Sequence, residues 1–244
     1  MVNLNRYRDT ISNFENNLKE ISKDIKKYLD NTVNLGKDFG GPSVYFHKMA
    51  LLEYKENYLN DNHLKMIYAV MPSWGMHRMG SKGAKMVGYN IFKNEILKNK
   101  EEILELKEKN YTEVNINNII KLLLEKIHVS TSNSYLVSSS KVLHHILPNI
   151  ISPIDRNYTL RFMKYNKKYW GSKSINVNNE EAYANIFFDK MYSFINENKN
   201  TMEKYIIQIN ENNIYSNNIN TSLIKIFDNL IMAYIKDNKG EIFE

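Results

Sequence analysis

The chain has 244 residues, of which 43% are hydrophobic and 25% are charged, a composition typical of a globular protein with a sizeable core. It contains no cysteine, which excludes disulfides, thiolate metal sites, iron–sulfur clusters and cysteine nucleophiles. The formal net charge is +6. The start, MVNLNRYRDT, lacks the apolar segment of a signal peptide, and no run of 18 apolar residues occurs, so we expect a cytoplasmic protein without a membrane partner.

The basic residues are concentrated in two blocks. Lys126–Asn179 holds eight cations, with Asp155 as its only acid, and Asn62–Asn94 holds five cations and no acid. If both blocks fold onto one side of the molecule, they form a face suited to a polyanion. The alternative is two solvated surfaces that share no target.

Apolar residues recur at helical spacing along nearly the whole chain. Gly36, Gly40, Gly41 and Pro42 predict a turn, after which Ser43 is a candidate N-cap. In chain order, the helices are expected at Leu4–Tyr28, Ser43–Tyr58, His63–Val70, Asn90–Lys109 (broken once), Asn115–His128, Ser140–Leu147, Asp155–Tyr169, Glu180–Asn196, Met202–Ile209 and Thr221–Lys236.

No convincing alternation of polar and apolar residues occurs, so the pattern predicts an all-α protein: a compact multi-helix domain of roughly nine to eleven helices. No internal repeat or long linker interrupts it. Residues 1–244 are therefore expected to form one domain, or two apposed lobes divided between residues 128 and 129.

The stretch SSSKVLHHILPNIISPIDRNYTLRF contains the first candidate site. Ser138, Ser139 and Ser140 are expected to cap the short helix that begins there, because their hydroxyls can satisfy its first N–H groups. Lys141 then lies in the first turn, where a cation meets the positive end of the helix dipole. A phosphate bound there relieves this conflict, and the alternative is a lysine that bends into solvent.

Asp155 follows a connection from Pro148 to Pro153 and is a candidate N-cap for the helix that begins with Arg156. A capping aspartate and a catalytic carboxylate are compatible interpretations, since capping fixes the position of the acid. Aromatic residues alternate with cations such as Arg161 along this helix, a pattern that suits base stacking and phosphate contacts. For most of the aromatic residues, however, we expect core packing.

A helix, a tight connection, Pro-Ile-Asp and a further helix together resemble the second half of the helix-hairpin-helix DNA glycosylase fold. This family binds DNA phosphate with a glycine-rich hairpin, and the resemblance assigns that turn to Leu136-Val137-Ser138. It assigns the family's nucleophilic lysine to Lys141 and its aspartate to Asp155. The sequence departs from the family pattern, because no glycine occurs between Gly88 and Gly171. The stretch is also similar to uncharacterised prokaryotic proteins with an S-K-x-L-H…P-x-D pattern.

The resemblance implies a role in DNA repair, with duplex DNA as the partner and a damaged base as the target. Asp155 would stabilise the positive charge that forms on the sugar when an N-glycosidic bond breaks. Lys141 could attack the sugar carbon only as a neutral amine. The base would leave the stack and enter a pocket lined by aromatic side chains.

Met71–Gly88 is the second candidate site, and it holds four of the chain's nine glycines. The functional interpretation is a second wall of the site, and the alternative is a kinked helix that packs closely through its small residues. Trp74 is the candidate for base stacking. The candidates for polar and phosphate contacts are His77, Arg78, Lys82 and Lys85.

No Walker loop or acid-rich metal cluster occurs, and the adjacent His144 and His145 point in different directions on a helix, so we expect neither a metal nor a cofactor. Three functions therefore remain open: a DNA-binding glycosylase-type protein, a non-catalytic nucleic-acid-binding or defence-related module, and a helical protein-interaction module.

Overall fold

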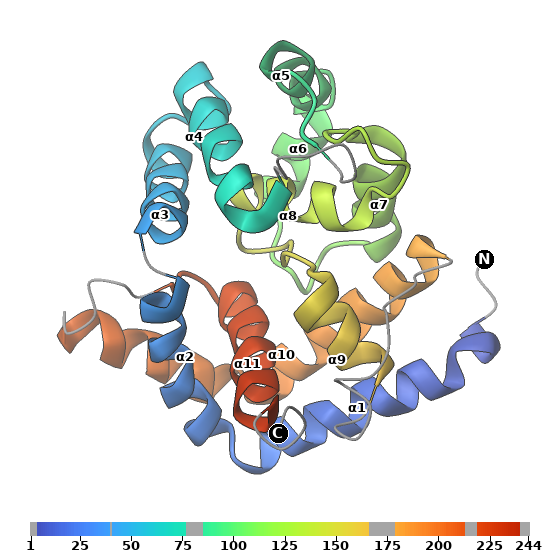
Figure 1. Ribbon diagram of the computed structural model, residues 1–244, viewed down its shortest axis with the longest axis vertical. Coiled ribbons are helices and arrows are strands. Elements are labelled where there is room, and N and C mark those ends of the chain that lie inside the picture. Colours follow the sequence, from blue (N-terminus) through green and yellow to red (C-terminus); the bar gives the residue numbers. More distant parts are fainter. Residues whose placement is uncertain (1–3, 40, 77–84, 166–178, 213–218, 240–244) are drawn as a thin grey trace. The chain divides into compact units, whose positions relative to one another are not determined.

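The computed structural model describes residues 4–39, 41–76, 85–165, 179–212 and 219–239. Within these ranges the chain forms eleven α-helices and four short 3-10 or π-helical turns (Figure 1). The predicted all-α class is confirmed, with the number of α-helices at the upper end of the expected range. Among the described helices, none combines the length and the apolar character that crossing a membrane requires.

Contacts within the chain divide it into two compact units. Unit 1 combines residues 1–38 with 154–244, and unit 2 consists of residues 39–153. The chain thus leaves unit 1 after α2 and returns to it directly before Asp155. These limits differ from the division between residues 128 and 129 at which the sequence suggested two lobes.

Unit 1 is built around long amphipathic helices. Its described helical elements are η1 (Leu4–Tyr7), α1 (Arg8–Lys23), α2 (Ile25–Phe39), η4 (Arg156–Leu160), α9 (Arg161–Lys164), α10 (Glu180–Asn212) and α11 (Leu223–Lys239). Phe14 of α1 lies in the core, with its ring centroid 5.7 Å from that of Phe162 and 6.2 Å from that of Phe187. Asn17 donates hydrogen bonds to the carbonyls of Phe162 and Tyr165, which supplies partners at the end of α9.

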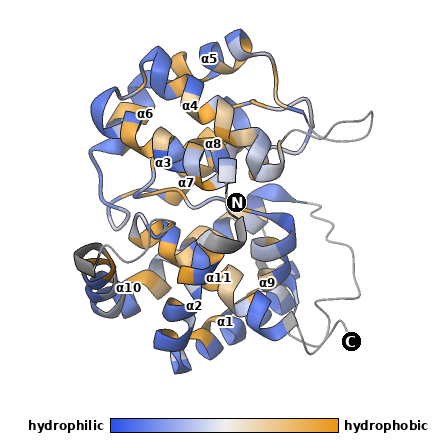
Figure 2. Cartoon of the chain, turned by 60° about the vertical axis from the view of Figure 1, so that its left-hand side comes forward, coloured by the Kyte–Doolittle hydropathy of each residue, from blue (hydrophilic) through white to orange (hydrophobic). Residues whose placement is uncertain are grey.

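Unit 2 contains the middle of the chain. Its elements are α3 (Gly41–Glu56), α4 (Asp61–Met71), η2 (Pro72–Met76), α5 (Tyr89–Leu97), α6 (Lys100–Lys107), α7 (Ile116–Lys121), η3 (Leu122–Lys126) and α8 (Leu136–Ile146). Helices α3 and α4 pack against each other, and both contact α8. In each unit the hydrophobic residues lie mainly on the sides of the helices that face other helices (Figure 2).

Several predicted boundaries are wrong for local reasons. The first helix is broken at Asp24, whose backbone (φ −141°, ψ 50°) separates α1 from α2. Gly36 lies inside α2, and α3 begins at Gly41 with φ +52°, so Ser43 is in its first turn and does not cap it. Conversely, Glu180–Asn212 is one helix where two were expected. The break expected within Asn90–Lys109 is confirmed between α5 and α6.

Candidate functional site

Asp155 is held at the start of η4 by two hydrogen bonds. Its carboxylate accepts from the backbone N–H of Asn157 at 2.7 Å, and its own N–H donates to Thr159 Oγ1 at 3.1 Å. The predicted N-cap is therefore confirmed. The Asp155 side chain is partly exposed, whereas Thr159 beneath it is buried, so the carboxylate is fixed from one side and open to solvent on another.

Two arginines follow Asp155 in the sequence. Arg156 is exposed, and Arg161, the first residue of α9, is partly exposed. Of the aromatic residues in this segment, Phe162 is fully buried, which confirms its expected place in the core, while Tyr158 and Tyr165 are partly exposed. Tyr169, the last residue of the expected helix, lies outside the described residues.

The three serines do not cap α8, contrary to the prediction. The helix begins at Leu136, after an N-cap residue, Tyr135, whose side chain makes no capping hydrogen bond. Ser138 Oγ and Ser140 Oγ donate to carbonyls three residues earlier, and Ser139 Oγ donates to Ile127 O at 2.6 Å. All three are buried. Their hydroxyls thus face the backbone and are not available to a phosphate.

This earlier start changes two assignments. Leu136-Val137-Ser138, which the resemblance equates with a hairpin turn, forms the first helical residues of α8. Lys141 lies more than one turn inside the helix and is 7% exposed, so the expectation of a first-turn lysine opposed to the helix dipole is wrong.

Lys141 is held against the second candidate segment. Its Nζ donates a hydrogen bond to Trp74 O at 2.7 Å. Trp74 and Gly75 form a kink at the end of α4, where Gly75 has φ +80°, and a side chain there would meet no atom within 4 Å. The structure therefore brings Lys141 and Trp74 together within unit 2, whereas Asp155 belongs to unit 1.

The remaining residues of the second segment are placed only in part. His77, Arg78 and Lys82 lie outside the described residues. Lys85 is exposed, and its backbone pairs with Thr131 through two hydrogen bonds.

Histidines surround Trp74, and of these the sequence drew attention only to His144 and His145, as a pair unsuited to hold a metal. The rings of His47, His144 and His145 lie 5.3, 6.2 and 4.8 Å from the Trp74 ring, centroid to centroid. His47 and His144 are nearly parallel, with 10° between their planes. With His63, four of the five histidines that the structure describes are buried in unit 2.

The hydrogen bonds assign the protons of three of these rings. Lys141 O and Ile151 O can only accept, so His145 Nδ1 and His144 Nδ1 donate to them at 2.9 and 2.8 Å. His63 is fixed the other way, because its Nδ1 accepts from Leu59 N–H and its Nε2 donates to His145 O. His63 is therefore neutral, and burial lowers its pKa to about 4.

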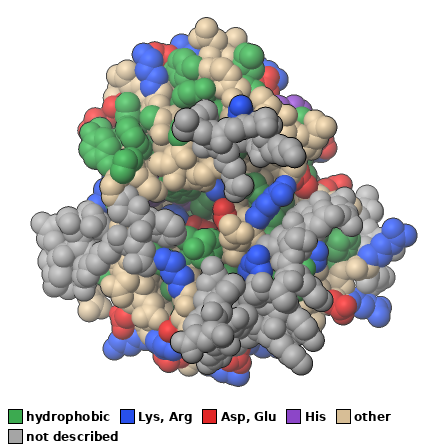
Figure 3. Space-filling view, viewed as in Figure 1, with side chains coloured by type: hydrophobic (Ala, Val, Ile, Leu, Met, Phe, Trp, Pro, Cys, Tyr) green, Lys and Arg blue, Asp and Glu red, His purple; other side chains and the backbone are tan. Residues whose placement is uncertain are grey.

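Ion pairs reduce the basic character of the two blocks. Lys65 and Lys93 both pair with Asp61, and Lys126 pairs with Glu102. Asp61 and Glu102 lie outside the two basic blocks, so the count of charges within each block overstated its free positive charge. On the face drawn in Figure 3, the described Lys and Arg side chains lie at several separate places among other side chains.

Among the described residues, no group of three or more histidine, aspartate or glutamate side chains is arranged to hold a metal ion. Comparison of the chain with protein-family models, with curated proteins and with solved structures gave no match.

Proposed function

We propose that the chain binds DNA and that Asp155 is the working carboxylate of a glycosylase-like site. The observation that carries this proposal is the capped, partly exposed Asp155 with Arg156 beside it. An N-terminal cap keeps an acid in one place, and a fixed carboxylate can stabilise positive charge that develops on a sugar. The neighbouring arginine side chains offer phosphate contacts on the same segment.

In this proposal Lys141 positions Trp74 and does not attack the sugar. The Lys141 Nζ is held as a hydrogen-bond donor to Trp74 O. Burial beside a histidine cluster leaves little room for a sugar to reach its Nζ. We therefore favour simple base excision over a lyase reaction, which would require a lysine–sugar imine.

A second candidate is a non-catalytic nucleic-acid-binding module on the same scaffold. It is favoured by the buried serines of α8, which remove the phosphate-binding hairpin that the glycosylase family would need. In that case Asp155 is a helix cap only, and Arg156, Arg161 and Lys85 supply contacts to the nucleic-acid backbone.

Fluorescence anisotropy separates these possibilities. A plain duplex and one that contains an abasic-site analogue are titrated with the protein at several salt concentrations. We expect tighter binding to the abasic duplex and a steep loss of affinity with salt. Arg156→Gln should reduce the slope of log K against log[salt] by about 0.9 if it removes one phosphate contact. Lys204→Gln, at an exposed position of α10, is the matched control and should leave the slope unchanged.

Asp155→Asn then tests the chemistry. This variant should bind DNA as the parent does and lose any release of a damaged base, because it keeps the cap and removes the charge. Equal affinity for both duplexes, with no base released, would support the binding module. Absence of binding at low salt would reject both candidates.

A further inference from the structure

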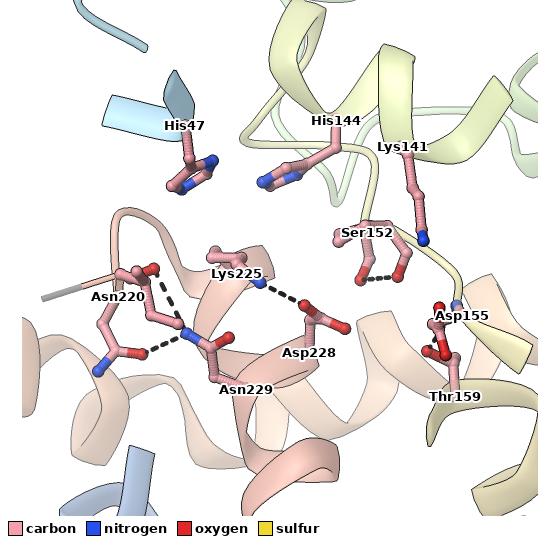
Figure 4. A network of polar contacts seen from close by, with 12 residues as sticks. His47, Lys141, His144, Ser152, Asp155, Thr159, Asn220, Lys225, Asp228 and Asn229 are labelled. Atoms are coloured by element: carbon pink, nitrogen blue, oxygen red, sulfur yellow. Dashed lines mark hydrogen bonds and ion pairs between the residues drawn. The ribbon is translucent and has the colours of Figure 1, made fainter. Parts of the chain in front are cut away.

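Helix α3 of unit 2 buries one of its sides against neighbouring helices. Val44, His47 and Ala50 lie on this side and are buried, and α3 contacts both α4 and α8. His47 points toward His144 of α8 (Figure 4), and the centroids of their nearly parallel rings are 5.9 Å apart. These contacts fix which side of α3 faces the core.

The outward side of α3 is apolar as well. Tyr45 is 59% exposed and Leu52 is 43% exposed, and Met49 between them is partly exposed. In the view of Figure 3, hydrophobic side chains gather over α3. A helix at the surface of a globular protein normally carries polar residues opposite to its core side, and a helix that is apolar all round is normally buried all round. The outward side of α3 thus indicates a surface that a partner covers.

Helix α1 shows the ordinary arrangement. Its Phe14 is buried, and about half a turn away around the helix lie Asn16, Lys19 and Lys23, which are all exposed. An apolar outward side is therefore not a general feature of the helices in this chain.

The outward residues of α3 have the spacing of a two-stranded coiled coil. Tyr45, Met49 and Leu52 are separated by four and then three residues, so they form one stripe along the helix. In the heptad notation abcdefg, Tyr45 and Leu52 occupy d positions and Met49 occupies the a position between them. Glu56 occupies the next a position, so the apolar stripe ends where the helix ends. A stripe of this kind packs against a second helix with the same spacing, and a second copy of the chain supplies one.

The charges beside the stripe favour two copies in parallel. Lys48 and Lys55 flank the stripe on one side, at g positions, and Glu53 flanks it on the other, at an e position. In a parallel pair the lysine side of each helix faces the glutamate side of the other, and Lys48 lies level with Glu53 of the second copy. An antiparallel pair would place the two lysine sides against each other. On one helix Lys48 and Glu53 point about 140° apart, so a direct contact between them requires two copies.

We propose that the chain forms a homodimer through α3, in which two copies pair in parallel along Tyr45, Met49 and Leu52. The contact comprises three apolar side chains from each copy, which is less than the roughly 800 Å² per partner of a standard interface. The dimer is therefore transient, with a Kd of roughly 10–100 µM. The inference is independent of DNA binding, because none of these residues belongs to the Asp155 segment.

Sedimentation velocity of the whole chain, without nucleic acid and at concentrations from well below to well above this Kd, tests the proposal. The mean mass should rise from the 28.8 kDa of one chain toward twice that value. Leu52→Glu places a charge in the stripe and should keep the protein monomeric. Ile91→Glu is the matched control, because Ile91 is an apolar residue of α5 that is 57% exposed, and this variant should dimerise as the parent does.

Two results would overturn the proposal. One is a parent protein that stays monomeric at the highest concentration, a result that needs no variant. The other is a Leu52→Glu variant that dimerises as well as the parent.

A charge exchange tests the lysine-to-glutamate arrangement. Glu53→Lys should weaken dimerisation about tenfold, because like charges then flank the stripe on both sides. Addition of Lys48→Glu should restore it, since the two sides again carry opposite charges. A double variant no better than Glu53→Lys alone would overturn the parallel arrangement.

The direction of pairing can also be measured by cross-linking, because the chain contains no cysteine of its own. In a parallel pair, position 45 of one helix lies beside position 45 of the other, so Tyr45→Cys should form a disulfide-linked dimer under mild oxidation. In an antiparallel pair centred between Met49 and Leu52, the two Cα atoms would lie about 16 Å apart along the helix axis, too far for a disulfide. A Tyr45→Cys protein that sediments as a dimer but forms no disulfide would overturn the parallel arrangement.

Discussion

Burial of His63 should make the stability of unit 2 depend on pH, and the size of this effect can be calculated. Burial lowers the pKa of His63 from its ordinary value of 6.5 to about 4. As the pH falls below 6.5, the unfolded chain binds a proton that the folded chain does not bind. His63 therefore reduces the free energy of unfolding progressively between pH 6.5 and pH 4, and its effect is constant below that range.

Between pH 7 and pH 5 the proton linkage of His63 amounts to a loss of about 2 kcal/mol. The structural reason is specific. A protonated His63 can no longer accept the hydrogen bond from Leu59 N–H at 3.1 Å, and it would carry an unpaired charge among Tyr54, Tyr58 and His145. Leu59 itself has φ +55°, so the lost bond supports a strained residue.

Urea unfolding measures the effect. Trp170→Phe leaves Trp74, which lies against the histidine cluster, as the only tryptophan and thus as a fluorescent probe of unit 2. In this background the free energy of unfolding is compared at pH 7 and pH 5, with and without His63→Gln, which keeps a donor toward His145 O. The variant should show a pH dependence smaller by about 2 kcal/mol. The same pH dependence in both proteins would refute the assignment of a neutral, buried His63.

Three further changes have expected outcomes. Asp155→Ala should lower the free energy of unfolding by about 1 kcal/mol and Asp155→Asn by much less, as measured in urea; equal losses would show that Asp155 does not act as a cap. Lys225 of α11 forms a buried ion pair with Asp228, in which the side chains are only 5% and 6% exposed. Lys225→Met alone should cost about 3–5 kcal/mol, and combining it with Asp228→Leu should restore most of that loss in thermal unfolding; an additive double variant would mean that the two charges are not coupled. Leu59→Gly should remove backbone strain of about 1 kcal/mol or more, but it also removes a buried side chain. The loss in free energy of unfolding, measured in urea, should therefore stay well below that of a core truncation. A loss as large as that of a core truncation would contradict a strained Leu59.

The sequence predicts the helices well where one apolar stripe faces one core. Asn115–His128 is an example, because most of its leucines and isoleucines are buried and Asn115 caps the segment, as its residue type favours. The sequence predicts helix boundaries less well where the backbone leaves the helical conformation at a residue other than proline or glycine. Neither proline nor glycine marks the end of α1 at Asp24, and the polar stretch that joins the two expected parts of α10 remains helical.

Of the site and core residues discussed above, the sequence alone indicated some and missed others. Asp155 was recognisable because a carboxylate after Pro-Ile and before a helical run is a cap whatever the tertiary structure. Lys225 and Asp228 were not recognisable, because an ion pair three residues apart on a helix usually lies at the surface. Only the tertiary packing of α11 against its neighbours buries this pair. The same holds for His47 and His63, which are distant in the sequence from His144 and His145 and meet them only in the folded unit.

The serines of α8 show how a correct local rule can give the wrong result. Three successive serines favour an N-cap as long as their hydroxyls compete for free N–H groups. In this chain the hydroxyl of Ser139 is directed at Ile127 O, and those of Ser138 and Ser140 are directed at carbonyls one turn back. The serines are thus small residues whose hydroxyls have backbone partners, so they allow α8 to be buried. In this buried helix Lys141 donates a hydrogen bond to Trp74 O. Substitution of Ser139 by alanine should therefore reduce the free energy of unfolding measured in urea, because Ile127 O would lose its buried donor.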